Sequence, residues 1–238
     1  MSRFPAGDAL QDLLPKRLAS LVTRYRRSGV ASTIRPDDGR MFVFTGDSAD
    51  GAVMSTNLRG QYLISARHMK DPNFSRTVVL IVEHNDSGSM GLVLNRPTAV
   101  EVRSALAGHF ELPEAEAPVL FGGPVEPQAL FLLHDSVEQS GGELPVLPGL
   151  FVGANAEVFE KIVVTAAATG VRYKVFSGCA GWGVDQLEGE LARGDWHIAP
   201  ADVDTVFSGD PYGLWERLID EVSRHPLFPD AGGDHRLN

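Results

Sequence analysis

Polar side chains able to do chemistry follow two apolar runs that are close together in the sequence, residues 77–82 and residues 91–94. They belong to Glu83, His84 and Asn85 after the first run and to Asn95 and Arg96 after the second. A carboxylate beside an imidazole can hold the ring in one tautomer and raise its basicity. An arginine can bind a carboxylate or a phosphate through two parallel hydrogen bonds. These residue types therefore allow a general base beside an anion-binding group.

The two apolar runs predict the strands that would position these groups. Residues 77–82 are rich in β-branched side chains and do not alternate with polar ones, which is typical of a strand buried on both faces. Residues 84–90 form a polar loop, and residues 91–94 return as the partner strand. We expect this hairpin to deliver both polar ends to one edge of the sheet. Two Gly-rich turns, residues 121–125 and 178–183, would close over the same rim.

The predicted binding rim comprises Arg76, Glu83, His84, Asn95, Arg96, Gly122, Gly123, Gly181, Trp182 and Gln186. Structural alternatives stand beside these roles and are favoured. Glu83 and His84 are neighbours on a strand, so they point to opposite faces and cooperate only if the strand bends there. Arg96 can equally pair with an internal acid. The glycines can form ordinary tight turns, and Trp182 can anchor the core.

Further motifs argue against a cofactor, a metal or an assigned catalytic residue. The spacing GxxGxG in residues 178–183 reverses the dinucleotide motif, and the seven histidines show no metal-ligand spacing. A phosphate-binding loop of the Walker type and a G-x-S-x-G nucleophile elbow are both absent from the sequence. The single cysteine, Cys179, excludes an intrachain disulfide. It is a possible redox site, although a buried inert thiol is the default.

Composition and charge restrict the class of protein. Of the 238 residues 43% are hydrophobic, which is enough for a sizeable core, and no apolar run is long enough to span a membrane. The net charge is −10, although residues 1–40 carry eight Lys or Arg against four Asp. An acidic body repels phosphate backbones, so nucleic-acid binding is disfavoured. A lone cysteine and the lack of a signal peptide predict a cytoplasmic protein without a membrane partner.

Periodicity along the chain predicts an α+β fold with a mixed sheet, because helices and strands do not alternate strictly. Residues 1–57 are an extension with an amphipathic helix over 8–26, residues 58–228 the main domain, and residues 229–238 a flexible tail. Predicted helices cover residues 100–110, 155–169, 185–193 and the segment after Asp210. Further strands are predicted at residues 62–65, 119–121, 130–134, 150–152, 171–176 and 196–198.

Several blocks of residues, taken in order, carry a family resemblance. They are residues 60–63 (GQYL), 71–84 (DPNFSRTVVLIVEH), 91–97 (GLVLNRP), 122–125 (GGPV) and 181–188 (GWGVDQLE). The chain resembles the AlgH/YqgE proteins, a bacterial family without an established biochemical activity, one member of which is named as a regulator of alginate synthesis. The resemblance implies a mixed, barrel-like sheet flanked by helices. The long N-terminal extension departs from the family pattern.

The sequence therefore predicts a non-catalytic regulatory protein, or one that binds a small-molecule or protein partner. The alternative is a hydrolase or transferase in which Glu83 or His84 acts as the base and Arg96 holds an anion.

Overall fold

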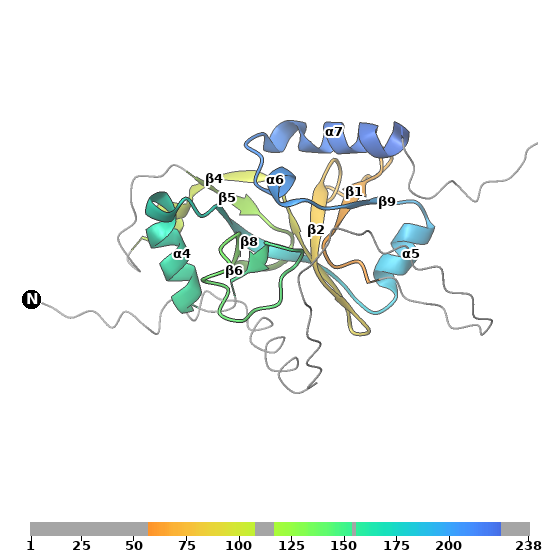
Figure 1. Ribbon diagram of the computed structural model, residues 1–238. Helices are drawn as coiled ribbons and strands as arrows, with labels where there is room; N and C mark the ends of the chain where they lie inside the picture. The colour runs from red at the N-terminus through yellow and green to blue at the C-terminus, as the bar shows by residue number, and fades with distance from the viewer. Residues whose placement is uncertain (1–56, 108–116, 154–155, 225–238) are drawn as a thin grey trace, which may run out of the picture.

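The computed structural model describes residues 57–107, 117–153 and 156–224 of the chain. Within them, nine strands form one sheet, with helices packed around it (Figure 1). The strands are β1 Gln61–Ser65, β2 Val78–Asn85, β3 Gly88–Val93, β4 Pro97–Glu101, β5 Pro118–Phe121, β6 Val125–His134, β7 Phe151–Val152, β8 Tyr173–Trp182 and β9 Trp196–Pro200. The helices are α3 Val102–Ala105, α4 Ala156–Thr169, α5 Gln186–Ala192, α6 Val203–Val206 and α7 Pro211–Arg224. The predicted helix over 8–26 and the predicted tail lie outside the described residues.

The sheet is mixed, as the sequence predicts. Its strands follow the order β4-β5-β8-β3-β2-β1-β9, and β6 pairs with both β7 and β8. Among the described pairs, β5 and β8 run parallel and the others run antiparallel. The long strand β8 joins the two halves of the sheet, because its first half pairs with β5 and β6 and its second half pairs with β3. The path ends at β4 and β9, so the sheet is open and does not close into a barrel.

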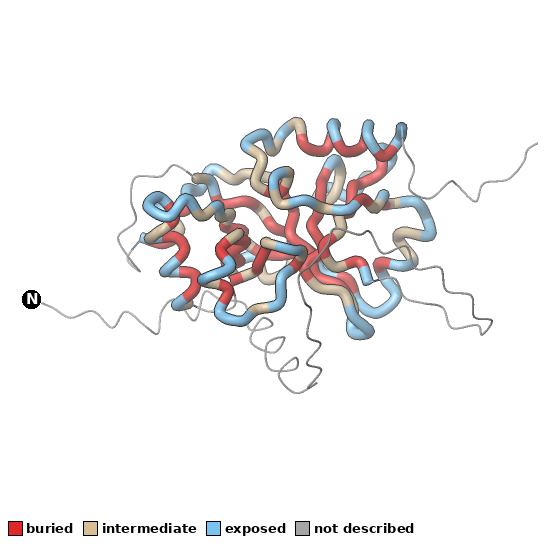
Figure 2. Tube along the Cα trace, in the orientation of Figure 1, coloured by how far each residue is buried: buried red, intermediate tan, exposed pale blue. Residues whose placement is uncertain are grey.

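Helices cover the sheet on more than one side, and the three longest, α4, α5 and α7, pack on three separate apolar clusters (Figures 1 and 2). The amphipathic stripe of α7 packs on the largest cluster, and five of its side chains are buried: Leu214, Trp215, Leu218, Ile219 and Val222. Each such side chain stabilises the fold by about 1.5–3 kcal/mol on burial. Helix α4 covers a second cluster with β6 and β8, and α5 covers a third.

Strand β2 contributes to two of these clusters, which explains why its sequence does not alternate. Val78 and Leu80 face the cluster under α7, whereas Val79 and Ile81 face the cluster under α5. Both faces of the strand are therefore buried, as the sequence predicts.

The predicted Gly-rich turn at residues 178–183 is wrong, because residues up to Trp182 continue strand β8. Antiparallel pairing with β3 decides the conformation, since Ser89 faces Trp182 and Gly91 faces Ala180 in the ladder. The glycines instead allow two backbones to approach. A Cβ atom on Gly122 would lie 2.1 Å from the carbonyl oxygen of Gly178, closer than such atoms can pack.

The region after Leu94 also differs from the sequence prediction. Residues 97–101 form β4, so residues 100 and 101 of the helix predicted over 100–110 belong to a strand, and α3 follows as a single turn. Proline is tolerated at the first residue of a strand, where Pro97 lies opposite Leu120. Residues 108–110 of the predicted helix lie outside the described residues.

Candidate functional site

The predicted hairpin of β2 and β3 forms, but the loop predicted over residues 84–90 is wrong, because β2 extends to Asn85 and β3 begins at Gly88. The polar ends of the two strands do not meet. Asn85 lies opposite Gly88 at the turn, whereas Val79 lies opposite Val93 near the open end. In an antiparallel pair the end of one strand is level with the start of the other, so Glu83 and Arg96 lie at opposite ends. At about 3.3 Å per residue, the length of β2 separates these ends by roughly 20 Å. The single common rim proposed from the sequence is therefore not assembled.

The open end of the hairpin holds Arg76, Asn95 and Arg96 in contacts that fix the backbone and helix α7. The Asn95 side chain accepts a hydrogen bond from the Val78 amide (3.0 Å) and donates one to the Arg76 carbonyl (2.9 Å). Arg96 donates to the carbonyl of Ser75 at 2.6 Å. These groups connect the strand ends to the preceding loop, which is the structural alternative to an anion site.

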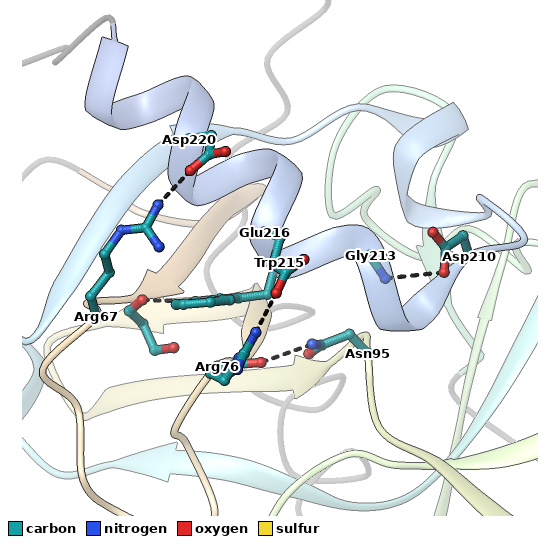
Figure 3. A network of polar contacts seen from close by, with 9 residues as sticks. Arg67, Arg76, Asn95, Asp210, Gly213, Trp215, Glu216 and Asp220 are labelled. Carbon is teal, nitrogen blue, oxygen red and sulfur yellow. Dashed lines mark hydrogen bonds and ion pairs between the residues drawn. The ribbon is translucent and has the colours of Figure 1, made fainter.

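Arg76 belongs to a network that holds α7 against the sheet (Figure 3). Its guanidinium pairs with Glu216 and lies 4.9 Å from the centre of the Trp215 ring. Arg67 contacts the same ring at 5.6 Å and pairs with Asp220. The indole of Trp215 donates to the Ser65 carbonyl at 2.9 Å. Since both arginines are engaged with helix carboxylates, this end of the hairpin is a clamp for α7.

The turn end of the hairpin holds Glu83 and His84, whose side chains contact different partners. Glu83 accepts a hydrogen bond from the Asn85 side chain at 2.6 Å. His84 instead places Nδ1 at 2.8 Å from the Ser89 hydroxyl and Nε2 at 3.7 Å from a carboxylate oxygen of Glu188 on α5. The His84 side chain is 9% exposed. The carboxylate beside the imidazole therefore comes from a distant helix, and the trio of Glu83, His84 and Arg96 is not assembled.

Trp182 and Gln186 take part in a polar cluster centred on Glu190 of α5. The indoles of Trp182 and Trp196 both donate to one Glu190 oxygen, at 2.9 and 2.8 Å, and the Gln186 amide donates to the other at 3.0 Å. The Gln186 oxygen accepts from the Gly183 amide at 3.1 Å. Trp182 is buried against Phe74, so it anchors the core as the structural alternative held.

The remaining predicted residues offer little room for a ligand. Gly122 and Gly123 are buried against the backbone of β8, and a Cβ atom on Gly123 would lie 2.3 Å from the Ala180 nitrogen. Gly181 is exposed at the position opposite Met90. Cys179 is 2% exposed. Among the residues that the structure describes, no group of three His, Cys, Asp or Glu side chains could hold a metal ion.

The structure instead contains a cavity that the sequence did not predict, where β5 begins alongside β8 and beneath the segment joining α6 to α7. Its volume is about 210 Å³. Apolar side chains form most of the wall, notably Val102, Leu120 and Phe207. Tyr173 and Lys174 of β8 both belong to this lining, and the Lys174 amine contacts Ser208 of the same lining. The site therefore combines apolar walls with one basic group.

Burial controls the chemistry of the Lys174 amine. Its Nζ atom is 3.4 Å from the Ser208 carbonyl, a long contact for a hydrogen bond. Desolvation lowers the pKa of Lys174 to about 8, with no offsetting contribution from a carboxylate of the described residues. Two nearby acids, Asp135 and Asp204, are paired with Arg172 at 2.7 and 2.8 Å. The ammonium form is thus left in an apolar cavity without a carboxylate partner among those residues.

Tyr173 in the same lining stays protonated at neutral pH, since burial raises the pKa of its hydroxyl.

Sequence alternation places Lys174 and Arg172 on one face of the strand and predicts that face to be half-exposed. Nothing in the local sequence indicates that the segment around Ser208, 34 residues further along, covers the lysine. This tertiary contact is why the cavity was missed.

A family model described as AlgH-like matches residues 62–226. The chain therefore belongs to this AlgH-like family. A UPF0301 protein of Chlorobaculum tepidum is 36% identical over 160 residues, covering 67% of this chain and 84% of the relative. A UPF0301 protein of Myxococcus xanthus is 38% identical over 175 residues, covering 72% and 94%. The predicted family is confirmed.

Two solved structures are similar to the fold. The solution structure of the AlgH protein from Pseudomonas aeruginosa has a TM-score of 0.57 and 31% identity, covering 78% of this chain and all of that one. The crystal structure of a Corynebacterium diphtheriae protein also has a TM-score of 0.57, with 22% identity, covering 71% of this chain and 88% of that one. Within the described residues, no helix is both long and apolar enough to cross a membrane.

Proposed function

We propose that this protein is a non-catalytic binding protein whose cavity at Lys174 takes a small apolar carboxylate. The observation that supports the proposal most is an ammonium group surrounded by apolar wall and without a carboxylate partner among the described residues. Burying a charge without a partner is costly. A ligand carboxylate would supply the missing negative charge, and its hydrocarbon part would cover the apolar wall.

The size and charge of the cavity narrow the class of ligand. Pockets for drug-sized molecules measure about 300–1,000 Å³, so a cavity of about 210 Å³ suits a smaller molecule. Lys174 is the one cationic side chain among the lining residues, which matches a monoanion better than a phosphate with two charges. The net charge of −10 also disfavours polyanions. A short fatty carboxylate meets all three conditions.

A regulatory role would act through the elements that form the cavity. Phe207, Ser208 and Gly209 belong to the segment that leads into α7, and α7 covers the largest apolar cluster. An occupant that contacts this segment would change the freedom of the helix that follows it. Ligand binding would then act on α7 through one continuous stretch of chain.

Calorimetric titration with hexanoate tests the proposal, with hexanol as the neutral molecule of similar shape. We expect hexanoate to bind wild-type protein, hexanol to bind at least tenfold more weakly, and Lys174→Met to lose the preference for the acid. Lys161→Met is the matched control, because Lys161 is exposed on α4. Equal binding of hexanoate by wild type and Lys174→Met, or no binding by either, would contradict the proposed function.

A further inference from the structure

The second property of Lys174 is that its amine is reachable as a nucleophile. Lys174 belongs to the lining of an open cavity, and both Lys174 and Ser208 remain partly exposed. The Ser208 carbonyl oxygen, 3.4 Å away, can accept a hydrogen bond from an N–H group of the amine. Because a carbonyl has no hydrogen to donate, this contact leaves the nitrogen lone pair free to react. A molecule small enough to enter could therefore bring an electrophilic carbon to the nitrogen.

The apolar wall changes how much of this amine is unprotonated. Desolvation lowers the pKa of Lys174 from 10.5 to about 8. At pH 7.5 a pKa shift of this size increases the unprotonated fraction roughly 200-fold over an exposed lysine. Desolvated lysines in apolar pockets are the lysines that form imines with carbonyl compounds.

We propose that Lys174 forms a reversible imine with a small apolar aldehyde that enters this cavity. The nitrogen lone pair attacks the carbonyl carbon, and the carbon–oxygen π bond breaks to give a carbinolamine. The nitrogen then forms a second bond to that carbon as the oxygen leaves with two protons as water. Amine plus aldehyde gives imine plus water, so no oxidant, reductant or other reactant is needed. The inference rests on the proposed function only in using the same cavity.

The chain carries its own controls, because it has four lysines: Lys16, Lys70, Lys161 and Lys174. Lys70 and Lys161 are exposed. The full-length protein is treated at pH 7.5 with a low concentration of hexanal and sodium cyanoborohydride, which traps imines as secondary amines. Peptide mass spectrometry then gives the initial labelling rate at each lysine. Repeating the reaction in urea removes the cavity while leaving the sequence unchanged.

We expect Lys174 to be labelled about tenfold faster than Lys70 and Lys161 in folded protein. The expected increase in labelling rate is smaller than the increase in the unprotonated fraction of the amine, because the cavity walls restrict the approach of the aldehyde. The advantage should disappear in urea, and Lys174→Arg should leave the rates at the two exposed lysines unchanged. Labelling of Lys174 at or below the rate of the exposed lysines would overturn the inference.

Excess hexanoate separates the inference from the proposed function. If the acid slows labelling at Lys174 and not at Lys70, both hold. If hexanoate binds in the titration and Lys174 is still labelled no faster than the exposed lysines, the imine fails and the binding function stands. If Lys174 is labelled rapidly and hexanoate neither binds nor protects, the imine stands and the carboxylate ligand is wrong.

Discussion

Replacing Lys174 by methionine should stabilise the protein, although most substitutions of partly buried residues destabilise. The substitution removes the ammonium group and keeps an unbranched apolar side chain that can line the same cavity. The pKa of Lys174 falls from 10.5 to about 8 on folding. At 1.36 kcal/mol per pKa unit, that shift corresponds to about 3 kcal/mol. Allowing for the water that reaches the open mouth, we expect a gain of about 2 kcal/mol at pH 7.

The sign of the pH dependence follows from the lowered pKa. Below pH 8 both folded and unfolded chains carry the proton, and the folded chain bears the cost of the buried charge. Between pH 8 and 10.5 the folded chain has lost the proton and the unfolded chain still binds it, so the contribution of Lys174 to stability rises with pH. The advantage of Lys174→Met should therefore shrink to less than about 1 kcal/mol at pH 10.

Urea unfolding of wild type and Lys174→Met at pH 7 and pH 10 measures both effects, provided that the slope against urea is unchanged. Lys161→Met, on the exposed face of α4, should change the free energy of unfolding by less than about 0.5 kcal/mol at either pH. A Lys174→Met protein less stable than wild type at pH 7, or a difference that does not vary with pH, would refute the description of a desolvated ammonium.

Three further predictions concern polar side chains elsewhere in the fold. Burial lowers the pKa of His134 to about 4, so the free energy of unfolding should fall as the pH drops from 6.5 to 4. Measured by urea unfolding between pH 7 and pH 4, wild type should lose about 3 kcal/mol more than His134→Phe. Glu190→Ala leaves two indole N–H groups without their acceptor and should cost about 2–5 kcal/mol, with a smaller loss for Glu190→Gln, measured by tryptophan fluorescence during denaturation. Asn95→Ala breaks two backbone contacts and should lower the free energy of unfolding by about 2–3 kcal/mol; a loss below 1 kcal/mol would show that water replaces the side chain.

Local sequence patterns correctly predicted the helices and strands whose buried side chains follow the regular spacing of that element. The buried face predicted for helix 155–169 matches α4, where Val158, Phe159 and Ile162 are buried as their spacing requires. The apolar stripe after Asp210 likewise matches α7. The continuous run in β2 was correctly assigned to a strand buried on both faces. In each case one segment carries the whole signal.

The sequence predictions that were wrong concern residues whose structure depends on contacts between segments far apart in the chain. Gly178 and Gly181 suggest a turn, yet both lie within β8. Gly181 pairs with β3, whereas Gly178 has a φ of +70° at an irregularity in the pairing with β6. Only the tertiary fold shows that Gly122 needs the space above Gly178. The predicted binding rim does not form, because an antiparallel hairpin places the C-terminal ends of its two strands at opposite ends of the hairpin. The cavity at Lys174 needs the segment before α7, which no local pattern connects to β8.

Titration of Lys174 by nuclear magnetic resonance, with the lysine side chains isotopically labelled, tests the central claim most directly. The resonances next to its Nζ atom should titrate near pH 8 in the free protein, well below the ordinary lysine value of 10.5. Saturating hexanoate should raise the Lys174 midpoint by at least one unit, because a bound carboxylate favours the charged amine. A midpoint near 10.5 without ligand, or one that hexanoate does not move, would contradict the proposed binding site.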